Sequence, residues 1–251
     1  MSPAVRNSRV ADASTDDESG KVEFCGTCAF SSACVSSGYS KAALRDLHVL
    51  VEHVGPFQAG DHLFREGDAF NAIAAVRAGV VKTVVVDNQG REQVLGFHLP
   101  GEVIGLNAIH ANRYPCDAIA LDTVMLCRFS FPQIATLASR LPGLQQHLFK
   151  LLSADIGKAA VLAGDFSADE RMAAFILFLS RRYAARGYSA SRLHLPMARA
   201  DIANYLGLAA ETVSRVLRRF QQDGLIAVDR REMEILDAER LRVLAASVLR
   251  D

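Results

Sequence analysis

Three cysteines near the beginning of the chain have the type and spacing that bind metals. Cys25, Cys28 and Cys34 form a C-x2-C-x5-C pattern in a segment that contains glycine and serine and shows no helical or strand period. Closely spaced thiols in a reducing compartment usually bind metal or carry out redox chemistry. Three thiolates do not complete a four-cysteine site, so a fourth ligand must come from elsewhere. Cys116 and Cys127 are the candidates.

Two kinds of metal group can use such a pattern. Zinc sites usually have two closely spaced cysteine pairs, and the second pair is missing here. A loop around a [4Fe–4S] cluster, completed by one distant cysteine, fits the spacing better. Cys116 and Cys127 can each also be small buried hydrophobic residues, which is a common role of a free cysteine. The pattern therefore predicts an iron–sulfur site, with zinc as the alternative.

A second group of residues has the chemistry that reads DNA bases. The segment after residue 196 predicts two helices joined by a turn at Gly207. On the second helix, Glu211, Ser214 and Arg215 share one face at the end that enters a major groove. Arginine can bind guanine, glutamate can accept from cytosine, and serine can contact either kind of base edge.

The surroundings of these residues support that interpretation. Arg218 and Arg219 follow one turn later, where phosphate contacts are expected, and the hairpin predicted at 225–236 resembles a wing. Residues 167–223 contain nine arginines and five acids, a local excess of four positive charges. The alternative is that Glu211 and Arg215 form only a surface ion pair, worth about 0.2–0.5 kcal/mol. It accounts for neither the glycine turn nor the wing.

Composition limits the remaining possibilities. The chain has 251 residues with 28 basic and 28 acidic side chains, so a uniformly basic nucleic-acid coat is excluded. No apolar run is long enough to cross a membrane. The polar residues 1–20 have no apolar stretch typical of a signal peptide, and we expect a disordered tail and a cytoplasmic protein.

The elements that must position these residues can be read from periodicity. Apolar residues at helical spacing predict a helix from about Lys41 to Gly55. Short segments with turn signals follow, including a hairpin at Asn88–Gly90, and predict a small antiparallel barrel up to about residue 131. A long helix with an apolar stripe then predicts a dimer contact. The seam residues are Leu148, Leu152, Ile156 and Ala159.

With both groups of residues in view, the chain resembles the FNR family, the fumarate and nitrate reduction regulators of the CRP/FNR transcription-factor superfamily. The resemblance covers about residues 22–240. The matching segments are CGTCAFSSAC, AGDHLFREGD, GFHLPGEVIGLNAI, MLCRFSF, RMAAFILFLSRRYAARGYS and DIANYLGLAAETVSRVLRRFQ.

The resemblance implies an α+β fold with an N-terminal cyclic-nucleotide-binding-like β-roll, a long dimerisation helix and a C-terminal winged helix-turn-helix. The corresponding ranges are a disordered tail at 1–20, a cysteine-rich cluster-binding loop at 21–39, the roll at 40–138, the dimerisation helix at 139–165 and the DNA-binding domain at 166–251.

The resemblance also implies an oxygen-responsive transcription regulator rather than an enzyme. One [4Fe–4S] cluster per subunit would promote homodimer formation and binding to TTGAT-like palindromes in double-stranded DNA under low oxygen, with RNA polymerase as a further partner. The family's β-roll cysteine lies in a segment like MLCRFSF, which makes Cys116 an extra thiol. The implied cluster ligands are Cys25, Cys28, Cys34 and Cys127, and the DNA contacts are Glu211, Ser214 and Arg215, with Arg218 beside them.

Superfamily members that bind cyclic AMP share a glycine-glutamate turn followed by an Arg-Ser pair for the phosphate. Here Gly101-Glu102 is present, but the later segment reads Tyr-Pro-Cys-Asp, and Asp117 would repel a phosphate. We therefore expect no cyclic nucleotide. The alternative is a regulator of the same superfamily that responds to another ligand, with the cysteines holding zinc or no metal. An iron–sulfur enzyme or electron carrier is disfavoured, because no glycine-rich nucleotide loop, second cysteine set or acid/base pair is visible.

Overall fold

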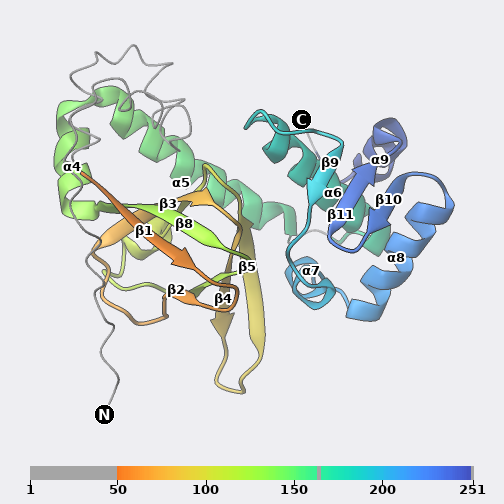
Figure 1. Cartoon of the computed structure of the whole chain (residues 1–251), viewed down its shortest axis with the longest axis horizontal. Coiled ribbons are helices and arrows are strands. Elements are labelled where there is room, and N and C mark those ends of the chain that lie inside the picture. Colours follow the sequence, from red (N-terminus) through yellow and green to blue (C-terminus); the bar gives the residue numbers. More distant parts are fainter. Residues whose placement is uncertain (1–49, 163–164, 250–251) are drawn as a thin grey trace.

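The computed structural model describes residues 50–162 and 165–249 and has the predicted α+β class. A β-roll and a helical domain with a small sheet lie side by side, and a long helix runs between them (Figure 1). The predicted tail and cysteine-rich loop, with Cys25, Cys28 and Cys34, lie outside the described residues. Among the described helices, none combines the length and the apolar character that a membrane span requires.

Within the described residues, the roll consists of two four-stranded antiparallel sheets, with strand orders β1-β8-β3-β6 and β2-β7-β4-β5. The strands are β1 Val51–Phe57, β2 His62–Phe64, β3 Ala72–Ala78, β4 Val81–Val86, β5 Glu92–His98, β6 Val103–Ile104, β7 Asp117–Ala120 and β8 Val124–Ser130. A short 3-10 turn, η1 Leu106–Ala108, follows β6.

Alternating side chains build one core on each face of the first sheet. On β8, Val124 and Leu126 face the interior of the roll, whereas Cys127 and Phe129 belong to the apolar cluster that the next two helices cover. Period-two alternation is what places neighbouring residues on opposite faces of a strand. The sheet is therefore buried on its inner face by the second sheet and on its outer face by helices.

The sequence-based expectation of a helix up to Gly55 is wrong in its described part, because Val51–Phe57 forms strand β1. Its partly buried residues are Val51, Val54 and Phe57, three residues apart. The pairing of β1 with β8 shifts between Val54 and Phe57, so an irregularity interrupts the two-residue repeat. Val51 packs in the apolar cluster on the outer face of the sheet and Phe57 in the cluster on its inner face, so the apolar residues of β1 serve two cores and do not form one helical face.

Two helices follow the roll, α4 Phe131–Arg140 and α5 Pro142–Leu162. Ile134 and Ala138 of α4 and Leu144 of α5 are buried against the outer face of the first sheet. Leu148, Leu151 and Leu152 pack partly against the same cluster, while Phe149 is 61% exposed. The long helix α5 therefore presents an apolar ring to its surroundings close to the roll.

The helical domain starts at a capping box in which Ser167 and Glu170 exchange hydrogen bonds. The predicted glycine turn and wing are also present. Its elements are α6 Ala168–Ala184, β9 Arg192–His194, α7 Arg199–Leu206, α8 Ala210–Gln222, β10 Ile226–Asp229, β11 Glu232–Ile235 and α9 Ala238–Ala245.

The roll and the helical domain share a core. Val84, Val94, Phe97 and Leu99 of the roll belong to the same apolar cluster as α6, α7 and α8. β5 lies at the edge of its sheet, and the Asn204 side chain of α7 completes that edge. Asn204 Nδ2 donates to the Glu92 carbonyl at 2.6 Å, and Asn204 Oδ1 accepts from the Val94 amide at 2.6 Å.

A buried ion-pair cluster closes the same joint. Arg182 of α6 donates to both Glu102 carboxylate oxygens, and Arg186 donates to Glu102 Oε1 at 2.8 Å. The Glu102 and Arg182 side chains are each 12% exposed. Burial alone would raise the pKa of Glu102, but Arg182, Arg186 and His98 outweigh it and lower the pKa to about 2. The carboxylate therefore remains charged at neutral pH.

We predict that Glu102→Gln lowers the free energy of unfolding at pH 7 by about 3–5 kcal/mol, because two guanidinium groups lose a buried partner. Urea unfolding of the full chain measures the change. A lowered folded-state pKa means that the stabilisation is complete above the ordinary pKa of 4.5 and is lost as the pH falls toward 2. The difference between the two proteins should shrink over that interval.

The matched control is Glu234→Gln, which removes one carboxylate from the exposed pair with Arg192, whose atoms lie 3.4 Å apart. Exposed pairs contribute about 0–1 kcal/mol. Equal effects of the two substitutions would contradict the role that we give to Glu102.

Candidate functional site

The recognition helix α8 is held against α7 by a tight turn. Gly207 ends α7 with φ of 65°, a left-handed conformation that residues with a Cβ adopt reluctantly. Arg171 of α6 donates to the Leu206 carbonyl at 2.9 Å, immediately before this turn. Helix α8 begins at Ala210, three residues after this turn. Its buried face consists of Val213, Val216, Leu217 and Phe220.

The predicted base-reading residues lie on the exposed face of α8. Glu211, Ser214 and Arg215 are all solvent-exposed. The Ser214 hydroxyl donates to the Ala210 carbonyl at 2.9 Å, and Arg215 Nη2 donates to Thr212 Oγ1 at 3.4 Å. In the described part of the chain, no ion pair joins Glu211 to Arg215. The Glu211 and Arg215 side chains therefore do not pair with each other, and both can contact a ligand.

A hollow beside this face carries positive charge. It has a volume of about 550 Å³, and Arg199 and Arg218 both line it. Partial burial lowers the pKa of Arg199 from its usual value, which leaves a guanidinium still charged at neutral pH. Gln221 and Gln222 add amide donors to the same wall. Such a set of donors suits the phosphate backbone of a nucleic acid.

Arg219 differs from the expectation for phosphate contacts. Its guanidinium pairs with Asp169 at the beginning of α6. This contact joins the recognition helix to the first helix of the domain, and it depends on a pairing fifty residues apart that the sequence does not reveal. Arg218, one position earlier, is exposed and remains the candidate for a phosphate contact.

The two candidate cysteines of the roll have different surroundings. Cys127 is partly exposed on the outer face of the first sheet, beside the apolar cluster under α4 and α5. Cys116 is fully buried, and its sulfur accepts a hydrogen bond from Asn107 Nδ2 at 3.7 Å. Burial raises the pKa of the Cys116 thiol. Since a metal-binding thiol must lose its proton, Cys127 fits the role of ligand better than Cys116 does.

The structure places a histidine beside Cys127 that sequence reasoning missed. His53 of β1 stands directly opposite Cys127 in the pairing of β1 with β8. The distance between His53 Nδ1 and Cys127 Sγ is 3.6 Å. The histidines show no metal-ligand spacing in the sequence, and this contact needs the strand assignment and register of β1, which the helical interpretation of that segment concealed.

The other implied cluster ligands, Cys25, Cys28 and Cys34, lie outside the described residues. Within the residues that are described, no group of three or more histidine, cysteine, aspartate or glutamate side chains is arranged to hold a metal. The partly exposed thiol of Cys127 has the chemistry of one thiolate ligand to a metal group.

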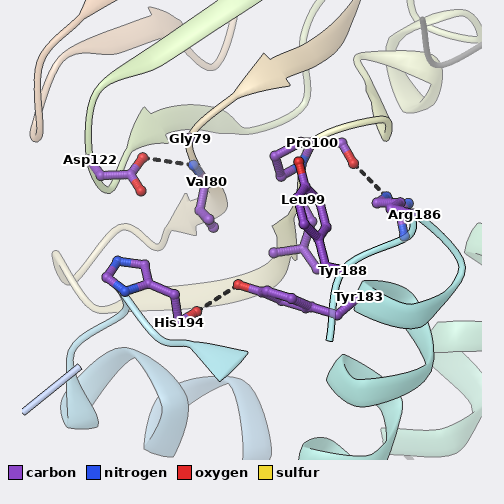
Figure 2. Close-up of a pocket in the computed structure, with 9 residues that line it drawn as sticks. All are labelled: Gly79, Val80, Leu99, Pro100, Asp122, Tyr183, Arg186, Tyr188 and His194. Carbon is purple, nitrogen blue, oxygen red and sulfur yellow. Dashed lines mark hydrogen bonds between the residues drawn. The ribbon is translucent and has the colours of Figure 1, made fainter. Parts of the chain in front are cut away.

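A cavity of about 180 Å³ lies at the joint between the roll and the helical domain. Figure 2 shows its polar groups bonded within the protein: Asp122 accepts from the Val80 amide, and the Tyr183 hydroxyl donates to the His194 carbonyl. Arg186, which also lines it, donates to Glu102 and to the Pro100 carbonyl. The glutamate of the glycine-glutamate turn is thus part of the domain joint.

Comparison with known proteins matches both halves of this architecture. Residues 55–140 match the cyclic nucleotide-binding domain family, and residues 170–244 match the Crp-like helix-turn-helix domain family. The transcriptional activator protein Anr of Pseudomonas aeruginosa is 40% identical over 228 residues, which cover 90% of this chain and 93% of that protein.

A second relative is the fumarate and nitrate reduction regulatory protein of Salmonella typhi, 38% identical over 88% of this chain and 90% of its own. Among solved structures, FixK2 from Bradyrhizobium japonicum aligns with a TM-score of 0.69 and 26% identity, covering 77% of this chain and 96% of that one. Full-length similarity, two matched domains and a shared fold agree, and the chain therefore belongs to the CRP/FNR family of transcription regulators.

Proposed function

We propose that this transcription regulator responds to oxygen through one [4Fe–4S] cluster per subunit. The ligands in this proposal are Cys25, Cys28, Cys34 and Cys127. When bound, such a cluster supplies an oxygen-sensitive link between the cysteine-rich segment and the roll. Relatives named as an anaerobic regulatory protein and as fumarate and nitrate reduction regulators support a role in low oxygen.

The observation that carries the proposal is the position of Cys127. Its partly exposed thiol adjoins the apolar cluster to which Leu148 and Leu152 of α5 contribute. A group attached to this sulfur therefore adjoins an apolar cluster to which the helix that we expect at the dimer contact contributes. Phe149, on the same helix, exposes an apolar ring that a second copy of the chain can cover. The side chains of Ile156 and Ala159 lie outside the described set.

In this proposal, the exposed face of α8 binds DNA. In a two-fold symmetric dimer, two recognition helices bind half-sites about 34–36 Å apart. Arg215 can read guanine, Glu211 cytosine and Ser214 either edge, while Arg218 neutralises phosphate. We propose TTGAT-like palindromes as targets and RNA polymerase as the further partner of the bound dimer.

The domain joint supports the expectation that no cyclic nucleotide binds. Glu102 already accepts hydrogen bonds from Arg182, Arg186 and the Leu99 amide. A nucleotide that used this carboxylate would have to displace a buried guanidinium, which is unfavourable. The alternative regulator, with zinc or no metal on the cysteines, is distinguished by the metal analysis that follows.

Protein purified without oxygen should contain the iron and sulfide of one [4Fe–4S] cluster per chain. It should also absorb visible light, and this absorbance should disappear in air. Serine in place of Cys25, Cys28, Cys34 or Cys127 should abolish all of these, because a ligand is removed. Cys116→Ser is the matched control and should retain them. Loss of the cluster in Cys116→Ser but not in Cys127→Ser would overturn the ligand assignment, and zinc or no metal in the parent protein would support the alternative regulator.

Two arginine substitutions on α8 should separate base reading from phosphate binding. Arg215→Ala should reduce discrimination at one base pair of each half-site by about 1–3 kcal/mol. Arg218→Ala should weaken binding to all sequences equally and reduce the salt dependence by about one counterion. Binding titrations over a series of half-site variants and salt concentrations measure both effects.

Arg242→Ala is the control for these measurements. Arg242 is about half exposed and belongs to α9, where it pairs with Glu239, so it is not part of the α8 face. It should leave affinity and base preference nearly unchanged. An unaltered base preference in Arg215→Ala would exclude this residue as a base contact.

A further inference from the structure

We propose that His53 donates a hydrogen bond to the Cys127 sulfur and thereby sets how long the protein retains its cluster in air. The inference rests on the proposed function, because it takes Cys127 as a cluster ligand. His53 is a positioning and tuning residue in this proposal, and it is not itself a ligand.

The register of two strands fixes the contact. The antiparallel pairing of β1 with β8 places His53 opposite Cys127 and Glu52 opposite Arg128. Directly opposed residues have Cβ atoms about 4.5–5.5 Å apart, within reach of an imidazole and a thiol. His53 Nδ1 and Cys127 Sγ are 3.6 Å apart. The adjacent pair is joined as well, since Arg128 Nη1 lies 3.5 Å from Glu52 Oε2.

The two partners differ in burial in a way that suits this role. Cys127 is partly buried beside the outer apolar cluster, with β1 on one side of its strand and β3 on the other. His53 is exposed and lies on β1, the edge strand of the sheet. Its imidazole therefore lies beside the sulfur at this edge of the sheet. Because His53 is exposed, its variants should fold.

The chemistry of thiolate ligands gives the direction of the effect. Hydrogen bonds to cluster sulfurs are among the factors that set the reduction potential, and a donor stabilises the more electron-rich state. The oxidant in air is dioxygen, which takes the electron that the cluster gives up. An N–H on Nδ1 therefore makes that electron loss less favourable. Without it, the protein should lose its cluster faster.

The test compares His53→Leu with His53→Asn in the full chain. Asparagine can place an amide N–H close to the position of Nδ1, whereas leucine has a similar size and no donor. Both variants should contain as much iron and sulfide as the parent protein when purified without oxygen. In air-saturated buffer, His53→Leu should lose its visible absorbance about two- to tenfold faster than the parent, the range expected for one hydrogen bond. His53→Asn should stay close to the parent rate.

Glu52→Gln is the matched control on the same strand and should leave the rate unchanged, because Glu52 contacts Arg128 and not the sulfur. The midpoint potential is an independent readout and should be lower in His53→Leu than in His53→Asn.

Each remaining outcome decides against one specific idea. Equal bleaching rates and potentials in the parent and in His53→Leu would overturn this inference alone and leave the cluster proposal intact. Loss of iron from His53→Leu without any exposure to air would also overturn it, because His53 would then be a ligand or a structural requirement. A parent protein without iron and sulfide would overturn the proposed function itself.

Discussion

A buried carboxylate joins the two domains of this regulator beside the apolar core that they share. Glu102 of the roll is tolerated in the interior only because Arg182 and Arg186 compensate its charge, and both arginines in turn need the carboxylate. The three groups are therefore stable only as a set. Because Arg182 belongs to α6, the first helix of the DNA-binding domain, this set fixes that domain against the turn before β6. The position of the recognition helix is thus determined by packing against the roll as well as by the connection from α5.

The same physical logic links the proposed sensor to the joint. Each of the three apolar clusters contains side chains from strands of the roll, so neighbouring clusters lie on opposite faces of the same strands. On β8, Cys127 faces the helices and Leu126 faces the interior; on β4, Val81 faces the interior and Val84 faces the DNA-binding domain. A change in the packing of α4 and α5 beside Cys127 is therefore connected to the domain joint through contiguous packed groups.

Local signals in the sequence were sufficient wherever the structure is determined locally. The hairpin turn before Arg91 and the turn at Gly207 both depend on neighbouring residues, and both were predicted. The misassigned strand β1 shows the limit, because its conformation depends on pairing with β8, more than seventy residues away in the chain. Contacts between distant segments were invisible for the same reason. The Glu102 cluster, the Arg219–Asp169 pair and the contact between His53 and Cys127 each require a register or domain packing that no short segment encodes.

The glycine-glutamate turn illustrates how one local structure can serve two purposes in a superfamily. In the members that the chain resembles and that bind cyclic AMP, this turn belongs to the nucleotide site. Here Gly101 has φ of 85° and holds the same kind of turn, but the carboxylate that follows is bonded to two guanidinium groups of the adjoining domain. Its pKa of about 2 means that it stays ionised and strongly attached to them at neutral pH. A signal that entered at this turn would first have to break the joint that positions the recognition helix. The proposed input at Cys127 lies on the helix-covered face of the first sheet and does not require this carboxylate to give up its partners.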